Sequence, residues 1–505
     1  MASDRLQRRC RRLAALAVAL ILAGCEVGPD YERPTAEAPV AYKEAAYKEI
    51  GDWKPSAPSD LLNRGPWWSI YNDPLLDQLE RQIDISNQNL KAAEAAYREA
   101  RAIVAEARAG LFPTLSVDAS AQRSGQGAGS GSSGTASRGR VQNQFSATAS
   151  ASWELDVWGR IRRTVESDVA SAQASAADLA AARLSAQALL AADYLELRVA
   201  DELKQLLDDS TAAFLRALQI TENRYNGGIA GRSDVASARA QYEGTRAQAI
   251  NVGVQRAAFE HAIAVLIGRP PAELTVAEAK FVAVVPVTPP GLPSTLLERR
   301  PDIAGAERRV AAANAQIGVA VAAYYPTLTL TASYGVVSSA IDTLFRAANG
   351  VWAVGPQLAQ TVFDAGLRSA QVDAARAFYD QNVANYRQTV LTAFQQVEDQ
   401  LAALRILEQQ AEVQNAAVVA AQEAEALIFN QYTAGTVAYT NVITAQTVAL
   451  GDRQNALNIL QNRLVASVTL LQALGGGWDA AQLPSDAQVK DGDAPAMRTS
   501  DAKTP

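Results

Sequence analysis

The residue types that most often perform chemistry in proteins are almost missing from this sequence of 505 residues. It has one histidine, His261, and two cysteines, Cys10 and Cys25. Metal centres, iron–sulfur clusters, disulfide frameworks and histidine-dependent triads need more of these side chains. The formal net charge of −7 leaves no basic excess to neutralise phosphates. We therefore expect no enzyme, no cofactor, no metal site and no nucleic-acid partner.

Cys25 is the residue whose surroundings predict a chemical modification. Five arginines precede an apolar run from Leu13 to Leu22, which is the pattern of a secretory signal. The run ends in Leu22-Ala23-Gly24-Cys25, which resembles a bacterial lipobox, so we expect cleavage after residue 24 and acylation of Cys25. In lipoproteins an aspartate at the next position signals inner-membrane retention; Glu26 stands there and favours the outer membrane. The alternative is an ordinary signal peptide.

Past the signal, no stretch of about 18 apolar residues follows, so a membrane crossing would have to use β-strands. Two pairs of segments, at 113–155 and 326–363, alternate apolar and polar residues as amphipathic strands do. The fourth segment, near 351–363, is less regular and contains Pro356, which predicts a bend or a bulge. The alternative is a half-buried sheet in a soluble domain. The apolar positions of the first strand are Leu115, Val117, Ala119 and Ala121.

The chain contains two similar halves. Phe112-Pro113-Thr114-Leu115 returns as Tyr325-Pro326-Thr327-Leu328, and from Gly159 onward the halves align at an offset of 207 residues. The first half has extra residues in a Ser/Gly-rich stretch at 124–134, which we interpret as a loop insertion because no Gly-Lys-Ser/Thr phosphate motif follows it. The aligned pairs include Gly159 with Gly366, Tyr225 with Tyr432, Gly228 with Gly435, and Gly268 with Gly475.

Long alanine-rich helices are predicted around the strand pairs. Stretches at about 162–224 and 367–431 would each be roughly 90–100 Å long at 1.5 Å per residue. Shorter helices, at about 77–110, 234–267 and 441–474, would each reach roughly 50 Å. Two short helices end to end match one long helix, so we expect an antiparallel array in which each long helix packs against a stacked pair.

A sheet of four strands cannot close into a barrel by itself. Open strand edges are not tolerated in lipid, so several copies of the chain must associate. Two copies would give eight strands with an interior filled by side chains, whereas three copies would give twelve strands and room for a pore. We therefore expect a homotrimer.

Several motifs resemble those of one protein family. They include Leu296-Leu297-Glu298-Arg299-Arg300-Pro301-Asp302-Ile303, Phe363-Asp364-Ala365-Gly366 and Ala473-Leu474-Gly475-Gly476-Gly477-Trp478. With these the chain resembles the outer membrane factor family, in the branch of lipoprotein efflux channels of OprM/NodT type, which are relatives of TolC. The resemblance covers the mature chain almost from end to end.

The resemblance implies a mainly α fold with a β-barrel part. It would be a TolC-like trimer with a 12-stranded outer-membrane β-barrel, four strands per chain, on a long α-helical barrel in the periplasm. The family's members are passive exit channels for drugs and toxic compounds. They work with a periplasmic adaptor (membrane fusion) protein and an inner-membrane pump of the resistance–nodulation–division (RND) class, and outer-membrane lipid surrounds the barrel.

We expect the following order along the chain. A signal peptide (1–24) precedes an acylated segment with equatorial residues (25–76). The first repeat (77–268) holds a β-hairpin at 113–155 and long helices at 160–267. An equatorial linker (269–300) leads to the second repeat (301–475), with a β-hairpin at 326–363 and long helices at 366–474. A C-terminal equatorial segment (476–505) ends in a tail that we expect to be disordered from about Ser485.

By resemblance, the two helix tips form the periplasmic aperture and the contact with the adaptor. Family members often place an acidic residue in the tip segment that here reads Ile443-Thr444-Ala445-Gln446. We expect Asp234 to replace that carboxylate, with Arg232 as a tether; the alternative is that Asp234 only caps the next helix. The expected aperture residues are Gly228, Arg232, Asp234, Gly435, Thr440 and Thr444.

Two other functions stay open. A type I secretion exit duct would share the architecture, although the lipobox and the Gly475-Gly476-Gly477-Trp478 end favour the efflux branch. A non-channel coiled-coil envelope lipoprotein would contain no amphipathic strand pairs.

Overall fold

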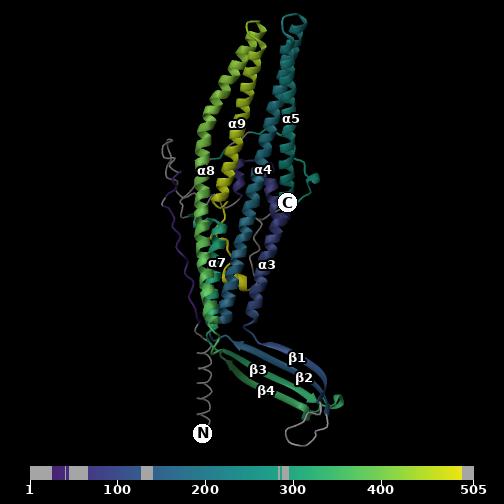
Figure 1. Ribbon diagram of the computed structural model, residues 1–505, viewed down its shortest axis with the longest axis vertical. Helices are drawn as coiled ribbons and strands as arrows, with labels where there is room; N and C mark the ends of the chain where they lie inside the picture. Colours follow the sequence, from purple (N-terminus) through teal and green to yellow (C-terminus); the bar gives the residue numbers. More distant parts are fainter. Residues whose placement is uncertain are drawn as a thin grey trace, which may run out of the picture.

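Helices run along the long axis of the molecule, and one sheet lies at one end (Figure 1). This computed structural model describes residues 26–39, 41–44, 66–126, 140–281, 285–286 and 295–491. Two helices of 67 residues, α4 (Arg160–Asn226) and α8 (Leu367–Thr433), span the helical part. Each is about 100 Å long at 1.5 Å per residue. In the described part of the chain, no helix is both long and apolar enough to cross a membrane.

Shorter helices flank the two long ones in stacked pairs. They are α3 (Gln88–Ala109) and α7 (Pro301–Ala322), of 22 residues each, and α5 (Arg232–Leu266) and α9 (Tyr439–Ala473), of 35 residues each. Helix α4 contacts α3 and α5 on one flank and α7 and α9 on the other, and α8 contacts α7 and α9. Equal lengths in the two halves reflect the internal duplication, and the array is the one that the sequence predicted.

The stacked pairs meet at two equivalent glycines. Gly268, just past α5, abuts Ser86 at the end of α2 (Pro74–Ser86), and a Cβ atom on Gly268 would lie 2.1 Å from the carbonyl oxygen of Ser86. Gly475, just past α9, abuts Arg299 at the end of α6 (Leu296–Arg299) with the same 2.1 Å clearance. Both glycines have positive φ angles, +69° and +95°. Both positions therefore exclude side chains, for reasons of space and of backbone conformation.

The helix predicted over residues 77–110 is broken. Helix α2 ends at Ser86 and α3 begins at Gln88, because Asn87 leaves the helical conformation (φ −61°, ψ 123°) and accepts a hydrogen bond from the backbone N–H of Leu90 at 2.9 Å. An asparagine cap inside a helical run gives little periodic signal, so the sequence pattern missed it. The break places the Ser86 carbonyl below the end of α5.

The four strands form one antiparallel sheet in the order β1-β2-β3-β4. They are β1 (Thr114–Gln126), β2 (Arg140–Leu155), β3 (Thr327–Ser338) and β4 (Gly350–Ala359). Strand β2 pairs with β3, which joins the two predicted hairpins. Strand β4 ends before the expected residue 363. Pro356 lies within it, opposite Leu330, and the register of β3 with β4 runs past it without the predicted bulge. Among the described strands of the single chain, β4 has β3 as its one paired neighbour, and such an edge strand tolerates the missing N–H group.

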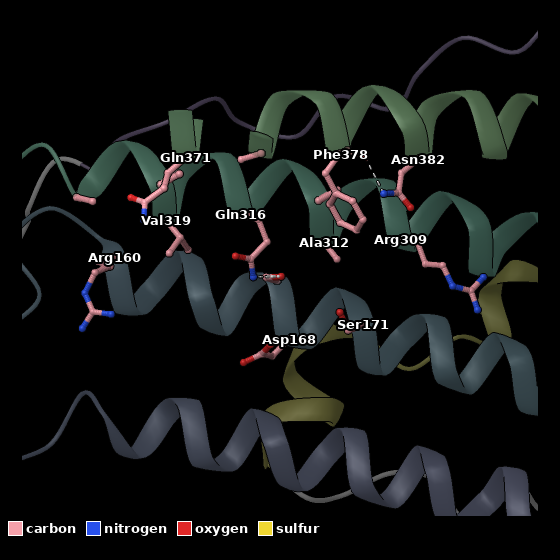
Figure 2. A pocket seen from close by; sticks show the side chains of 15 residues that line it. Arg160, Asp168, Ser171, Arg309, Ala312, Gln316, Val319, Gln371, Phe378 and Asn382 are labelled. Carbon is pink, nitrogen blue, oxygen red and sulfur yellow. Dashed lines mark hydrogen bonds between the residues drawn. The ribbon is translucent and has the colours of Figure 1, made fainter. Parts of the chain in front are cut away.

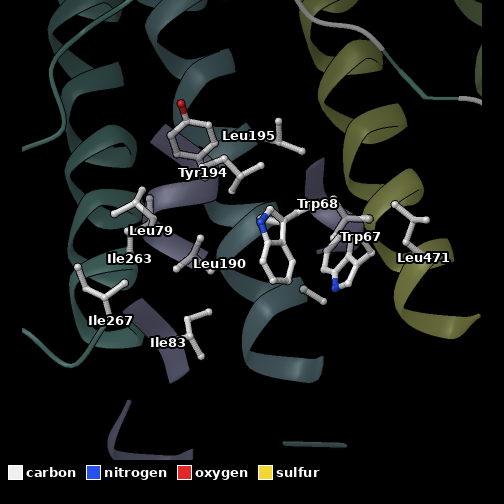
Figure 3. Close-up of a cluster of buried hydrophobic side chains, with 14 of the residues drawn as sticks. Trp67, Trp68, Leu79, Ile83, Leu190, Tyr194, Leu195, Ile263, Ile267 and Leu471 are labelled. Atoms are coloured by element: carbon white, nitrogen blue, oxygen red, sulfur yellow. The ribbon is translucent and has the colours of Figure 1, made fainter. Parts of the chain in front are cut away.

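The largest buried cluster of the described residues lies where α5 and α9 end beside α2 and α6, a level that we call the waist (Figure 3). It joins Leu79 and Ile83 of α2, Leu190 of α4 and Ile263 of α5. Trp67 and Trp68 of η1 (Trp67–Tyr71) pack into it edge to face, with their ring centroids 5.9 Å apart. This core packs η1 and α2 against the long helix α4 and against the ends of α5 and α9.

Both described terminal segments pack on one side of the helical wall. In the N-terminal arm, Asp30 pairs with Arg163 of α4 at 2.9 Å. Residues 486–491, which we expected to be disordered, form α10 (Asp486–Asp491) because Val489 is buried against α3 and α4. Tyr31 of the arm and Leu483 line one common cavity. Residues 492–505 of the predicted disordered tail lie outside the described part.

Candidate functional site

One face of the sheet is apolar across all four strands, up to Ala121 and its partner Phe145; beyond them Arg123 and Asn143 lie on the same face. Leu115 lies opposite Ala151, and Tyr334 lies between Ala149 and Trp352. Opposed residues of antiparallel strands project from the same face. The exposed fractions are 82% for Leu115 and 74% for Trp352. An apolar face of this extent is typical of a surface that contacts lipid.

The other face of the sheet carries hydroxyl groups. The Oγ atoms of Ser116 and Ser150 are 2.8 Å apart, and a second cross-strand serine pair, Ser120 with Ser146, repeats this spacing. Among the strand side chains that the structure describes, the charged ones on this face are Asp118 and Glu154. The threonines and serine of β3 on this face are Thr327, Thr329, Thr331 and Ser333. Such a face suits a water-filled lumen.

Glu154 connects this polar face to the helical wall. Its two carboxylate oxygens each accept a hydrogen bond from Arg160 Nη2 at 2.9 Å, in the first turn of α4. Arg160 also lines a groove of about 820 Å³ formed by α4, α7 and α8 (Figure 2). The polar side of the sheet therefore continues onto the groove side of the wall.

The two helical hairpins contact each other near their tips, at the end of the molecule far from the sheet (Figure 1). Arg224 Nη1 donates hydrogen bonds to the carbonyl oxygens of Tyr432, at 2.8 Å, and Thr433, at 3.1 Å. The guanidinium lies over the Tyr432 ring, 4.6 Å from its centroid. A cation at the last carbonyls of α8 also meets the negative end of the helix dipole. One side chain of the first hairpin thus holds the end of the second.

Aromatic packing supports this contact. The rings of Tyr432 and Tyr439 are 5.1 Å apart, and the Tyr432 hydroxyl lies 3.3 Å from Thr221 Oγ1 of α4. Burial, and then the neighbouring Tyr432 and the charge of Asp234, raise the pKa of Tyr439 to about 12. The charge of Asp234 in the first tip therefore acts on Tyr439 in the second tip.

The predicted aperture residues of the first tip lie at the turn between α4 and α5. Gly228 has a φ of +75°, and Gly435 in the second tip has +79°, so both take the left-handed conformation of a helix-ending turn. Asp234 Oδ2 accepts a hydrogen bond from the Gly231 N–H at 3.2 Å, which is the capping interaction of the alternative interpretation. Arg232 is exposed.

In the second tip, Thr440 and Thr444 are exposed on the first turns of α9. The Thr444 hydroxyl donates to the Thr440 carbonyl at 3.0 Å, within its own helix. The charge of Asp234 thus acts on Tyr439 of the second tip, whereas Thr444 makes no hydrogen bond across the tips among the described residues.

Arg224 and Thr221 are functional candidates that the sequence did not single out. A signal was present: at the offset of 207 residues, Arg224 corresponds to Gln431, so the two repeats differ in charge at this turn. Their neighbours differ in burial as well, because Tyr432 is buried whereas its counterpart Tyr225 is 44% exposed. Breaks in the symmetry of a repeat point to positions with individual roles.

The two remaining residues singled out from the sequence, Cys25 and His261, belong to no site within the described part of the chain. Cys25, the expected acylation site, lies outside the described residues. His261 is exposed on α5. Within the described ranges, no group of three or more His, Cys, Asp or Glu side chains is arranged to hold a metal ion.

The sheet has one apolar face suited to lipid and one face lined by hydroxyl groups, and it is joined to helices of about 100 Å. This combination defines the subunit of a membrane channel with a long extension from the membrane. The family model for outer membrane efflux proteins matches residues 79–269 and 292–476. The chain belongs to this family.

Known relatives are similar in sequence over nearly the whole length of this chain. The probable efflux pump outer membrane protein TtgC of Pseudomonas putida is 33% identical over 479 residues, 93% of this chain and 96% of the relative. The cation efflux system protein CusC of Escherichia coli is 29% identical over 470 residues, 92% of this chain and 99% of the relative. The solved structure of the outer-membrane channel OprN superposes with a TM-score of 0.81 at 29% identity and covers 90% of this chain and 100% of that one.

These findings confirm the predicted family, the TolC-like fold class and the efflux-channel function. The chain is an outer-membrane efflux channel protein, with its sheet in the outer membrane and its helices in the periplasm.

Proposed function

We propose that three copies of this chain close into one tube, the passive exit duct of a tripartite efflux system. The observation that carries the proposal is a wall with two open edges. The sheet ends at β1 on one side and at β4 on the other. The helical wall ends with α3 and α5 at one edge and with α8 at the other. Open strand edges are not tolerated in lipid. A head-to-tail contact that closes after three copies pairs every edge and gives twelve strands around a lumen.

In this proposal a periplasmic adaptor docks on the helix tips and an inner-membrane RND pump supplies the energy. Drugs and other toxic compounds pass through the duct, and the chain itself catalyses nothing. A non-channel coiled-coil lipoprotein is disfavoured because the sheet has two chemically distinct faces.

Deleting the gene tests this function. Intracellular dye retention and drug susceptibility are both expected to rise, and expression of the full chain from a plasmid restores resistance. In planar bilayers the purified trimer is expected to conduct ions. Unchanged susceptibility together with unchanged dye retention would argue against an efflux role.

The aperture is proposed to consist of Gly228, Arg232 and Asp234 from the first tip with Gly435, Thr440 and Thr444 from the second. Because Thr444 carries no carboxylate, Asp234 supplies the negative charge of the constriction. Asp234→Ala is expected to raise single-channel conductance and drug leakage.

The variant Asp234→Asn separates this role from helix capping. An asparagine side chain still accepts the cap hydrogen bond but carries no charge. If Asp234→Asn conducts like the wild type while Asp234→Ala does not, Asp234 acts as a cap, and the gate lies elsewhere. Acylation of Cys25 is a separate part of the proposal, and the mass of the N-terminal peptide of the mature protein tests it.

A further inference from the structure

The groove of α4, α7 and α8 near the sheet is a cavity with no assigned role. Its volume of about 820 Å³ falls within the range of about 300–1,000 Å³ that is typical of small-molecule sites. Figure 2 shows Asp168 on α4 and Phe378 on α8, with α7 between them. Much of the lining is alanine and valine, among them Ala312, Val319 and Ala375.

The groove lies on the side of the wall that faces the lumen in the proposed trimer. On α7, Asn314 donates a hydrogen bond to the carbonyl of Pro29 in the N-terminal arm at 3.0 Å, whereas Gln316 lines the groove. Two residues along an α-helix project about 200° apart, so arm and groove lie on opposite sides. The pair of Arg160 with Glu154 links the groove to the hydroxyl-lined face of the sheet.

Most polar groups of the groove are already paired. Arg160 is bound by Glu154, and Arg309 pairs with Asp178 of α4. Gln316 Nε2 donates to Ser167 Oγ at 2.8 Å. Asp168 differs, because its half-buried carboxylate makes no ion pair or hydrogen bond with the described residues. The groove therefore presents one uncompensated negative charge.

Phe378 supplies the second element of recognition. Its ring lines the groove and is 52% exposed in the single protomer. An aromatic ring attracts cations at its face and packs against planar apolar bodies. The apolar lining between Phe378 and Asp168 has room for such a body.

We propose that this groove is a transit site for amphiphilic monocations with a planar apolar body, in which Asp168 binds the positive charge and Phe378 the ring system. The proposal rests on the duct function above, because cargo reaches the groove only if the trimer forms a tube that conducts it past this side of the wall. A weak site of this kind is compatible with conduction, because the cargo must bind well enough to enter and weakly enough to leave.

The charges around Asp168 predict how the site responds to pH. Burial, and then the charge of Glu106 on α3, raise the pKa of Asp168. The two arginines that line the groove pair with other carboxylates, Arg160 with Glu154 and Arg309 with Asp178. The lining residues of α8 do not titrate. As pH falls through this raised pKa, the carboxylate becomes neutral, and cation binding is expected to weaken.

Ethidium binding to the purified full-length protein in lipid nanodiscs tests the proposal by fluorescence polarisation, with empty nanodiscs as the blank. Asp168→Asn is expected to weaken binding about fivefold to tenfold, the value of one partly exposed charge pair. Phe378→Ala is expected to weaken it as well. Asp209→Asn, which removes an exposed carboxylate of the same helix outside the groove, is the matched control and leaves binding unchanged.

Conductance of the same proteins in planar bilayers separates this proposal from the duct function. If the wild type conducts but binds ethidium no better than Asp168→Asn, the transit site is wrong and the duct stands. If Asp168→Asn and Asp209→Asn lower binding equally, ethidium responds to overall charge and the groove is not its site. Loss of conductance in the wild type would instead overturn the duct.

Discussion

Glu80 on α2 is fully buried in the waist, and neither carboxylate oxygen has a hydrogen-bond partner in the described structure. Burial raises its pKa well above the usual value, and the charges of Asp84 and Asp77 raise it further. The folded protein therefore binds this proton more tightly than the unfolded chain does. The ionised form destabilises the fold, so this residue costs stability as pH rises above the ordinary glutamate pKa.

Glu80→Gln is expected to remove that cost. At pH 7.5 the variant should melt about 1 °C above the wild type, the shift that corresponds to about 1 kcal/mol in a chain of 505 residues with about 2.1 cal/mol/K of unfolding entropy per residue. The difference should shrink as the pH is lowered toward 4.5, because the unfolded chain then binds the proton as well and the wild type no longer loses stability to it. Circular dichroism melts across this range measure it. Glu94→Gln, at an exposed position of α3, is the control; an equal gain there would remove burial as the cause.

Arg224 acts at the tips. Arg224→Ala removes two hydrogen bonds from a charged donor and a cation–π contact with Tyr432, together worth about 2 kcal/mol or more. The tips should separate more often, and single-channel conductance should rise severalfold. Arg239→Ala is the matched control, since Arg239 pairs with Glu222 inside the first hairpin. Equal conductance of the two variants would mean that the Arg224 contact does not restrain the aperture.

At the scale of elements, the stacking of α5 on α2 and α3 depends on Gly268. Gly268→Ala would place a methyl group 2.1 Å from the Ser86 carbonyl and force an L-residue to a φ of +69°. We expect a loss of about 2 kcal/mol or more in stability and earlier proteolytic cleavage at the waist. Limited proteolysis combined with thermal melting measures both.

A glycine inside α5 provides the control for Gly268, which lies just past that helix. A Cβ atom on Gly244 would meet nothing within 4 Å, and Gly244 has ordinary helical geometry. Gly244→Ala is therefore expected to stabilise α5 by about 0.5–1 kcal/mol. If both variants lose stability alike, helix stacking at Gly268 is not the reason.

At the scale of the whole molecule, insertion into the membrane depends on the two faces of the sheet. Val354 projects from the apolar face of β4 and is 72% exposed, whereas its neighbour Ala353 lies opposite Ser333 on the polar face. An arginine on a lipid-facing strand costs about 2–4 kcal/mol at the bilayer midplane. Val354→Arg should therefore reduce the amount of trimer in outer-membrane fractions, and Ala353→Arg should reduce it much less.

The quantity to compare is folded trimer per cell, from membrane fractions run on gels without heating. Equal losses in Val354→Arg and Ala353→Arg would mean that lipid does not cover the apolar face. The two residues are adjacent in β4, so both variants place the same side chain at nearly the same height of the sheet, on opposite faces.

Local periodicity and internal repetition determined much of this protein from sequence alone. Alternation with a period of two marks residues 115–121 as an amphipathic strand, because strand geometry itself sends successive side chains to opposite faces. Helix lengths follow from uninterrupted apolar spacing, and the recurrence of Gly268 at Gly475 follows from duplication. These features depend on neighbours in the chain, so one sequence is enough to recognise them.

The tertiary structure decided what distant segments do to each other. It joined β2 to β3 across more than 170 residues, broke the first helix at Asn87 where α5 ends, and placed Arg224 on the carbonyls of α8. It also placed Asp168 in a groove built by three helices, where it makes no ion pair or hydrogen bond with the residues that the structure describes. No local pattern encodes such contacts, because each depends on how two helices or strands pack, and packing is a property of the whole wall.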